Sequence, residues 1–371
     1  MKKRRKFCGF LAFLVLLAVA LIPAGKSQAA KLPALKVKGT KLMNSRGRTV
    51  QLKGVSTHGL SWYPQYVNQK AFTYMKKYWK INAVRLALYT ADYNGYCNSD
   101  YANRLKLLKT VDQGIKSATS AGLYVIVDWH ILSDGNPQTN QNRAISFFAR
   151  MAKKYKNNTN VIYEICNEPN GGTSWDAIRT YAGKVIRTIR KYDKNAVILV
   201  GTPNWSQDVD VAAEKPLKGY QNIMYTLHFY AGTHGSWLRD KAQKALDKGL
   251  PLFVSEFGIS DASGNGSLNK TEGNAWIRFL NKNKISYLGW SLCNKAESSA
   301  LIKSSVSKTT NWTSKDLTDW GRWLFRRRWQ QEQQLRRTIP LQKQSLPVKT
   351  RSRTQPGKTA SNMSAENSIT M

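Results

Sequence analysis

The chain has 371 residues, and its 58 Lys and Arg outnumber its 22 Asp and Glu, so the formal net charge is +36. This length suits two small domains or one large barrel. Hydrophobic residues make up 42% of the chain and aromatic residues 11%, which excludes a wholly disordered protein. So large a positive charge raises the question of a nucleic-acid or acidic partner, and the answer depends on where the charge lies.

The N-terminus has the pattern of a secretory signal. Residues 2–6 are all basic, an apolar run follows up to Ile22, and small residues come next. This order is typical of a signal peptide, whereas the apolar run is short for the alternative, an uncleaved membrane anchor. We predict a signal peptide over residues 1–30, cleaved after Ala29 or Ala30. The mature protein is then expected to be extracellular and free of the membrane.

The C-terminal segment is basic and poor in apolar residues. From Arg326 to Met371 there are ten Lys and Arg against two acids, and Trp329 is the one aromatic residue. Such a segment buries too little apolar surface to offset its ordering entropy, so we predict disorder. Three interpretations stay open: attachment to an acidic polymer, an extension without function, and a frameshifted reading of the gene.

Between these ends, residues 31–325 carry a net charge of +22, spread over segments with helical character. The sequence has no Lys/Arg block interleaved with aromatic residues, no Cys–His finger and no RNA-recognition signature. A solvated helix surface is therefore favoured, and no nucleic-acid partner is expected. The cysteines after the signal peptide, Cys97, Cys166 and Cys293, lie far apart and form no C-x-x-C motif. We therefore predict neither a metal site nor a cofactor.

Apolar runs rich in β-branched and aromatic residues recur along the chain, separated by stretches with helical spacing. The predicted strands are Val50–Thr57, Ala83–Tyr89, Tyr124–Trp129, Val161–Ile165, Ala196–Gly201, Ile223–Phe229, Pro251–Phe257 and Ile285–Ser291. The predicted helices are Tyr101–Ala121, Gln141–Tyr155, Trp175–Lys191, Trp237–Lys248 and Asn274–Asn283. Eight strands alternating with helices predict an α/β fold, a (β/α)8 TIM barrel forming one catalytic domain over residues 31–325. A doubly wound sheet is the alternative, but no G-x-G-x-x-G or P-loop opens a helix.

In a barrel, the side chains at the strand ends converge on one rim, where chemistry takes place. Polar and aromatic residues stand at or just beyond most of the predicted strand ends. The candidates for the site are His58, Trp62, Arg85, Tyr89, His130, Asn167, Glu168, His228, Tyr230, Glu256, Trp290, Lys295 and Glu297.

Glu168 and Glu256 follow the fourth and seventh predicted strands. Each has a structural interpretation, Glu168 as a turn residue before proline and Glu256 as an ion-pair partner of Arg85. Together they match the two carboxyl groups of glycoside cleavage, one protonated and one ionised. Arg85 would keep Glu256 charged, and repulsion between the carboxyl groups would help to keep Glu168 protonated. A separation of about 5–5.5 Å predicts retention of configuration, and about 6.5–9.5 Å predicts inversion.

The segment of residues 161–171, VIYEICNEPNG, resembles the acid/base signature of glycoside hydrolase family 5, in particular that of the bacterial secreted endoglucanases (cellulases). The resemblance runs from about Gly54 to Gly321. Its further motifs, in family order, are Val84-Arg85-Leu86, Val127-Asp128-Trp129-His130, His228-Phe229-Tyr230, Ser255-Glu256-Phe257-Gly258 and Trp290-Ser291-Leu292.

The resemblance implies that Glu168 is the general acid/base and Glu256 the nucleophile. It also implies that Arg85 and Tyr230 hold the nucleophile and that Asn167 donates to the 2-hydroxyl of the reacting sugar. By the same resemblance, Trp290 is the platform under this sugar, and the cleft is lined by His58, His130 and His228. More distant glucose units would be bound by Trp62, Lys295 and Glu297.

These observations predict a monomeric endo-β-1,4-glucanase that acts on β-glucan with retention of configuration. A mannanase, a xylanase or a mixed-linkage glucanase on the same barrel is the alternative within the glycosidases. A metal-dependent hydrolase is disfavoured because no H-x-H or H-E-x-x-H motif is present. A non-catalytic sugar-binding protein is disfavoured because both carboxyl groups are in place.

Overall fold

The computed structural model describes residues 31–325, so the predicted signal peptide and C-terminal tail lie outside the described residues. Eight parallel strands close into a barrel in the order β10-β3-β4-β5-β6-β7-β8-β9. The barrel strands are β3 (Lys53–Thr57), β4 (Ala83–Tyr89), β5 (Tyr124–His130), β6 (Val161–Glu164), β7 (Ile198–Val200), β8 (Ile223–Tyr230), β9 (Leu252–Gly258) and β10 (Tyr287–Leu292). All eight predicted strands are present, and the predicted (β/α)8 barrel is confirmed.

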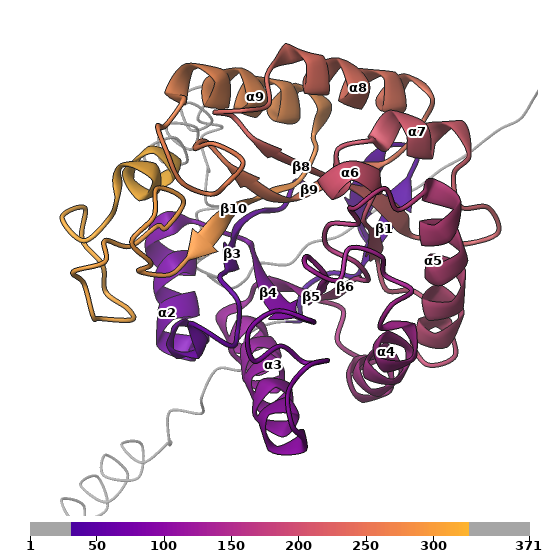
Figure 1. Cartoon of the computed structure of the whole chain (residues 1–371), viewed down its shortest axis with the longest axis horizontal. Helices are drawn as coiled ribbons and strands as arrows, with labels where there is room; N and C mark the ends of the chain where they lie inside the picture. The colour runs from indigo at the N-terminus through magenta and orange to yellow at the C-terminus, as the bar shows by residue number, and fades with distance from the viewer. Residues whose placement is uncertain (1–30, 326–371) are drawn as a thin grey trace, which may run out of the picture. The chain divides into compact units, whose positions relative to one another are not determined.

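Helices surround the strands in a ring (Figure 1). The longer ones are α3 (Tyr101–Ala121), α4 (Gln141–Tyr155), α5 (Trp175–Arg190), α8 (Ser236–Asp247) and α9 (Lys270–Asn283). The shorter ones are η1 (Pro64–Tyr66), α2 (Gln69–Tyr74), η2 (Met75–Trp79), α6 (Pro203–Ser206) and α7 (Val209–Glu214). Within residues 31–325, no helix is both long enough and apolar enough to cross a bilayer.

Side-chain caps set the bounds of several helices. Asp100 accepts a hydrogen bond from Asn103 N at the start of α3, and Gly122, with φ +68°, ends this helix in the left-handed conformation. The helix α9 begins at Lys270, four residues before its predicted start, because the Asn269 side chain accepts from the backbone N–H of Glu272. The apolar spacing alone did not reveal this polar first turn.

An antiparallel hairpin of β1 (Leu35–Lys38) and β2 (Lys41–Asn44), which the sequence analysis did not predict, precedes the barrel. Its backbone binds the N-terminal end of the barrel, since Val37 N donates to Asn222 Oδ1 at 3.0 Å and Asn222 comes directly before β8. Leu35 and Leu42 pack there against a layer of buried apolar side chains. The barrel residues of this layer are Ala83, Tyr124, Ile126, Ile162, Val197, Leu199, Met224, Phe253 and Leu288.

Candidate active site

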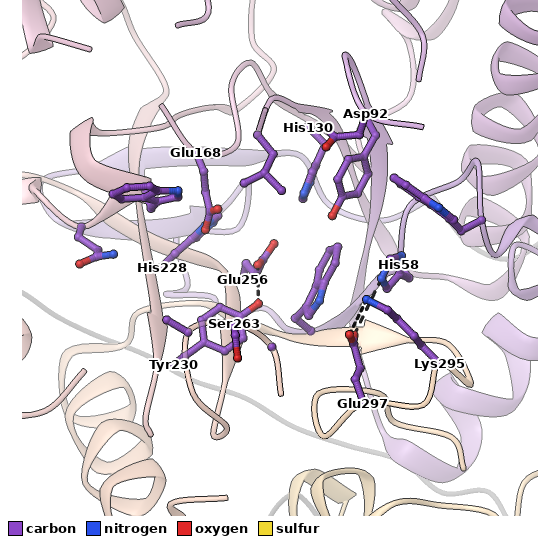
Figure 2. A pocket seen from close by; sticks show the side chains of 18 of the residues that line it. His58, Asp92, His130, Glu168, His228, Tyr230, Glu256, Ser263, Lys295 and Glu297 are labelled. Atoms are coloured by element: carbon purple, nitrogen blue, oxygen red, sulfur yellow. Dashed lines mark hydrogen bonds and ion pairs between the residues drawn. The ribbon is translucent and has the colours of Figure 1, made fainter. Parts of the chain in front are cut away.

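A cleft of about 700 Å³ contains eleven of the thirteen side chains that the sequence predicts for the site, while Arg85 and Asn167 are fully buried (Figure 2). These eleven are His58, Trp62, Tyr89, His130, Glu168, His228, Tyr230, Glu256, Trp290, Lys295 and Glu297. They come from the C-terminal ends of the strands or from the segments that follow them, which is where the barrel topology predicts a site.

Glu256 lies near the end of β9, and both of its carboxylate oxygens accept a hydrogen bond. Tyr230 Oη donates to Oε1 at 2.7 Å, and Arg85 Nη1 donates to Oε2 at 2.9 Å. Because one donor is a guanidinium, the hydrogen bond from Arg85 is charge-assisted. The two donors fix the orientation of the carboxylate, as a nucleophile requires.

Arg85 lies in the centre of a buried charged cluster on the inner surface of the barrel. Its guanidinium forms ion pairs with Glu164 at 2.7 Å, Glu256 at 2.9 Å and Asp128 at 3.1 Å. It also donates to Asn167 Oδ1 at 2.6 Å. Burial raises the pKa of Asp128 to about 7, and Arg85 opposes this shift. One guanidinium thus organises three carboxyl groups, of which only Glu256 lines the cleft.

Glu168 stands in the segment after β6 and is almost fully buried, with 9% of its surface exposed. Its pKa is raised to about 8, mainly by burial, while Arg85 lowers it and the charges of Asp128 and Glu164 raise it further. Protonation of this carboxyl group agrees with the sequence analysis, but the cause differs. Burial in the cleft wall is the main cause, and the like charges come from Asp128 and Glu164 rather than from Glu256.

A chain of hydrogen bonds fixes the proton on Glu168. Ser255 Oγ donates to Glu164 Oε1 at 2.6 Å, so it accepts from His228 Nε2, which lies 2.9 Å away. Burial lowers the pKa of His228 to about 4, so the imidazole is neutral and its Nδ1 carries no proton. Nδ1 lies 2.9 Å from Glu168 Oε1 and therefore accepts the proton of the carboxylic acid. With a neutral His228, this geometry agrees with the raised pKa of Glu168, and both favour a protonated carboxyl group.

The two candidate catalytic carboxyl groups are close together. One carboxylate oxygen of Glu168, one of Glu256 and one ring nitrogen of His228 all lie within 4.8 Å of one another. Of the described residues, this is the one group of His, Cys, Asp and Glu whose spacing could hold a metal ion. All three side chains already hydrogen-bond within the protein, so what they offer here is proton transfer and nucleophilic attack. The two carboxyl groups are thus close enough for the arrangement that the sequence analysis links to retention of configuration.

Asn167 lies beneath the cleft with its amide engaged on every side. Its Nδ2 donates to Ile131 O at 3.1 Å and lies 3.2 Å from His130 Nε2. His130 Nδ1 in turn lies 2.6 Å from Asp128 Oδ2. The structure thus places Asn167 as a link between Arg85 and His130, and a hydrogen bond to a sugar hydroxyl would have to share these amide protons.

Aromatic rings form one wall of the cleft. Trp290 lies between two imidazoles, with ring centroids 5.2 Å from His58 and 5.3 Å from His130. The rings of Trp62 and Tyr89 meet edge to face at 4.8 Å. Flat rings of this kind suit the apolar faces of glucose units.

Lys295 and Glu297 lie on the same side of the cleft as His58 (Figure 2). They form an ion pair at 2.6 Å, and Glu297 Oε1 is 4.0 Å from His58 Nε2. Lys295 is half exposed, whereas Glu297 is mostly buried. Their charged groups are placed to bind hydroxyls of sugar units away from the reacting bond.

Sequence reasoning missed several functional side chains. Asp128, Glu164 and Ser255 complete the buried network, and their signal was a polar residue inside an apolar strand run. Trp205, which is 44% exposed, also lines the cleft. It lies in a left-handed stretch with φ values of 56°, 55° and 59° at residues 204–206, held by a bond from Trp205 N to Pro169 O. No sequence pattern marks such a loop.

The remaining lining residues also escaped sequence reasoning, among them His234, the fourth histidine. Its Nδ1 accepts from Tyr230 N at 2.8 Å, and burial lowers its pKa to about 4. This contact supports the backbone of Tyr230, whose hydroxyl hydrogen-bonds to Glu256. The other lining residues that were not predicted are Tyr63, Asp92, Leu132, Asn204, Gln207, Ala262, Ser263 and Gly264.

A cleft at the C-terminal end of a (β/α)8 barrel, with one protonated and one ion-paired carboxyl group facing each other, defines a glycoside hydrolase. The family model "Cellulase (glycosyl hydrolase family 5)" matches residues 43–296. The chain belongs to this family, and the resemblance found in the sequence is confirmed.

Two curated relatives illustrate the similarity. Endoglucanase A of Butyrivibrio fibrisolvens is 47% identical over 292 residues, which cover 78% of this chain and 67% of that protein. An endoglucanase of Clostridium saccharobutylicum is 49% identical over 288 residues, covering 77% of this chain and 63% of that protein. The chain thus spans about two thirds or less of the length of these relatives.

Solved structures agree with this assignment. The cellulase Cel5C_n superposes with a TM-score of 0.77 at 42% identity, covering 80% of this chain and 91% of that one. The catalytic domain of Thermobifida fusca endoglucanase Cel5A, in complex with cellotetraose, gives a TM-score of 0.75 at 34% identity, with 80% and 97% covered.

Proposed function

We propose that the protein is a secreted endo-β-1,4-glucanase that hydrolyses internal bonds of β-glucan with retention of configuration. The observation that carries the proposal is the pair of carboxyl groups in the cleft, because one oxygen of Glu168 lies within 4.8 Å of one oxygen of Glu256. Carboxyl groups this close agree better with the separation of about 5–5.5 Å in retaining enzymes than with the about 6.5–9.5 Å that lets a water molecule attack directly. The names of the endoglucanase relatives and the cellotetraose bound to the Thermobifida fusca enzyme support a glucan as substrate.

In the first step, Glu256 attacks the anomeric carbon of the sugar, and Glu168 donates its proton to the departing glycosidic oxygen. A glycosyl ester forms on Glu256 as the glycosidic bond breaks. Tyr230 and Arg85 hold the nucleophile in the attacking orientation. The hydrogen-bond chain through His228 keeps the proton on Glu168 until the leaving group arrives.

In the second step, water enters and hydrolyses the ester. Glu168, now ionised, takes a proton from this water as its oxygen attacks the anomeric carbon. The bond to Glu256 breaks, and the carboxylate again accepts from Arg85 and Tyr230. The two displacements together restore the original configuration and return both carboxyl groups to their starting states.

The cleft lining supports an extended, neutral polysaccharide. Trp62, Trp205 and Trp290 offer three flat surfaces for sugar rings, and Lys295 with Glu297 offers polar contacts away from the reacting bond. Binding on several sugar units in a cleft is what internal cleavage requires. We propose β-1,4-glucan as the preferred substrate over mannan and xylan.

The activity test compares the release of reducing ends from carboxymethyl-cellulose, lichenan, mannan and xylan, with Glu256→Ala as the control. We expect the highest rate on carboxymethyl-cellulose, and a rapid fall in viscosity relative to reducing-end release. A higher rate on lichenan would favour a mixed-linkage glucanase. Preferential release from mannan or xylan would overturn the proposed substrate. Loss of activity on prolonged treatment with a chelator would instead favour a metal-dependent hydrolase.

Secretion is supported by the sequence pattern of residues 1–30, and the mature enzyme is proposed to be one catalytic domain over residues 31–325 followed by the basic tail. N-terminal sequencing of the extracellular protein should give a start at Ala30 or Lys31. An extracellular protein that retains residues 1–29 would contradict cleavage. A monomeric state and the lack of a nucleic-acid partner stay predictions.

A further inference from the structure

The segments that follow the strands and those that precede them carry opposite charges. Each of the strands β3–β9 is followed by a segment that leads to the next helix, and these seven segments contain no Lys or Arg. The helices that end them are α2, α3, α4, α5, α7, α8 and α9, so η1 and α6 lie inside the segments. The acids in these segments are Asp92, Asp100, Asp134, Glu168, Asp208 and Asp261. The longer segment after β10, residues 293–318, carries charges of both signs. Lys and Arg are therefore absent from the loops of the cleft face that follow β3–β9, and the lysines of this face lie in the segment after β10.

The opposite face of the barrel is strongly basic. It consists of residues 31–52, which include the hairpin, and the short segments directly before β4–β10, because the strands are all parallel. The basic residues there are Lys31, Lys36, Lys38, Lys41, Arg46, Arg48, Lys80, Lys156, Lys191, Lys194, Lys215, Lys218, Lys248 and Lys284. The one acid in these segments is Asp193, which is buried and accepts from two backbone N–H groups.

Few of these positive charges are neutralised. Among the described ion pairs, only Lys215 and Lys248 of this set have acidic partners. These positive charges lie close enough to affect one another, since burial and the charge of Lys284 both lower the pKa of Lys41. Interaction with helix C-termini accounts for cations just after a helix. It does not account for those of residues 31–52, which precede the first helix of the described chain.

This basic face is hollowed on both sides of Leu35. One hollow, of about 620 Å³, is lined by Lys36, Tyr220 and several amide side chains. The other, of about 330 Å³, is lined by Lys156, Lys194 and Tyr192, whose side chain is 40% exposed. The hollows share Ala34, Leu35 and Asn195, so they adjoin each other. Tyrosine rings, amides and ammonium groups together can contact the apolar faces, hydroxyls and carboxylates of acidic sugars.

We propose that this basic face is a second polysaccharide-binding surface, which takes a carboxylated polysaccharide such as a polyuronate. Helices end at this face, so it presents few of the free backbone N–H groups that favour phosphate. Twelve of its fourteen cations are lysines, whose ammonium groups attract the carboxylates of such a polymer as point charges. A polymer held here leaves the cleft at the opposite end of the barrel open to neutral glucan.

The experiment measures binding of the full chain to polygalacturonate over a range of salt concentrations. Lys36→Glu, Lys156→Glu and Lys194→Glu, combined in one variant, remove three exposed ammonium groups from the hollows. We expect at least a tenfold loss of affinity and a weaker salt dependence, because fewer counterions are released on binding.

The matched control combines Lys106→Glu, Lys109→Glu and Arg150→Glu, which change the net charge equally at exposed positions on α3 and α4. We expect less than a threefold loss of affinity. The basic segment after residue 325 is the same in both variants and cancels in the comparison. Equal losses in the two variants would overturn the proposal in favour of a net-charge effect.

Two further measurements identify the kind of polymer and the place of binding. Tyr192→Ala should weaken binding of polygalacturonate by a few-fold and leave binding of polyphosphate unchanged. Saturating polygalacturonate should not inhibit hydrolysis of a neutral cello-oligosaccharide. Tighter binding of polyphosphate, or competitive inhibition at the cleft, would overturn the proposal. Binding is measured without hydrolysis, so failure here leaves the proposed glucanase activity untouched.

Discussion

The two ends of the barrel interior are built from the same strands but have opposite chemistry. On β5, Ile126 belongs to the apolar layer at the N-terminal end, and Asp128, two residues on, belongs to the charged cluster. The same step leads from Ile162 to Glu164 on β6. Residues two apart on a strand point to the same side of the sheet, so the barrel interior changes from apolar to charged over two residues of each strand.

This difference separates stability from chemistry. The apolar layer, sealed by Leu35 and Leu42 of the hairpin, is stabilised by the burial of apolar surface. The charged cluster has one guanidinium for three carboxyl groups, and burial raises the pKa of Asp128 and of Glu164. Substitutions in the apolar layer should therefore change the free energy of unfolding and leave turnover unchanged, whereas substitutions in the charged cluster should change turnover.

The largest effect is expected for the catalytic pair. Glu256→Ala removes the nucleophile and Glu168→Ala the acid, so turnover should fall by several orders of magnitude in each. Both variants should stay folded, because Arg85 keeps its ion pairs with Asp128 and Glu164. Glu214→Ala, an exposed position on α7, is the matched control and should keep full turnover. Near-wild-type turnover in either catalytic variant would refute the assignment.

Arg85→Met should affect both stability and turnover. It leaves Asp128, Glu164 and Glu256 without their shared cation, and breaking a buried ion pair costs about 3–5 kcal/mol. Urea unfolding measures the stability loss, and steady-state kinetics on a soluble glucan measures the fall in turnover. A loss of stability without a change in turnover would show that the cluster is only structural.

The apolar layer should respond in the opposite way. Ile126→Ala or Leu288→Ala creates a cavity among fully buried neighbours and should lower the free energy of unfolding by about 2–5 kcal/mol. Turnover, measured well below the unfolding transition, should stay close to that of the wild type. If turnover fell as steeply as stability, the two ends would not be separable.

The smallest effect concerns pH. Glu168 has a pKa raised to about 8 by burial, so it is protonated below this pH and loses its proton above it. Since the first step needs the protonated acid, kcat/KM on a neutral oligosaccharide should fall about tenfold per pH unit above pH 8. Thermal unfolding at each pH serves as the control for a folded enzyme. A decline that begins near pH 5, the ordinary range of glutamate, would contradict the burial argument.

The sequence predicted the barrel and the catalytic pair because both depend on local patterns. Apolar runs such as Ala83–Tyr89 identify buried strands, and parallel strands bring their C-terminal ends together. The role of Glu168 followed from its motif, but the cause of its raised pKa did not. Burial of a side chain depends on contacts between distant segments, which a single sequence does not display.

The parts that escaped prediction are likewise non-local. The hairpin strands β1 and β2 have only four residues each, too short for a periodicity signal. The position of Trp205 depends on three consecutive left-handed residues held by contacts to the segment after β6. Glu164 was visible as a charge inside an apolar run, but its partners Arg85 and Ser255 come from other strands.

The central claim is that Glu168 and Glu256, held close together at the charged end of the barrel, act by double displacement. The direct test is proton NMR of the first product formed from a neutral cello-oligosaccharide, before mutarotation. The account predicts that the β-anomer appears first, because two inversions at the anomeric carbon restore its configuration. Initial formation of the α-anomer would contradict it.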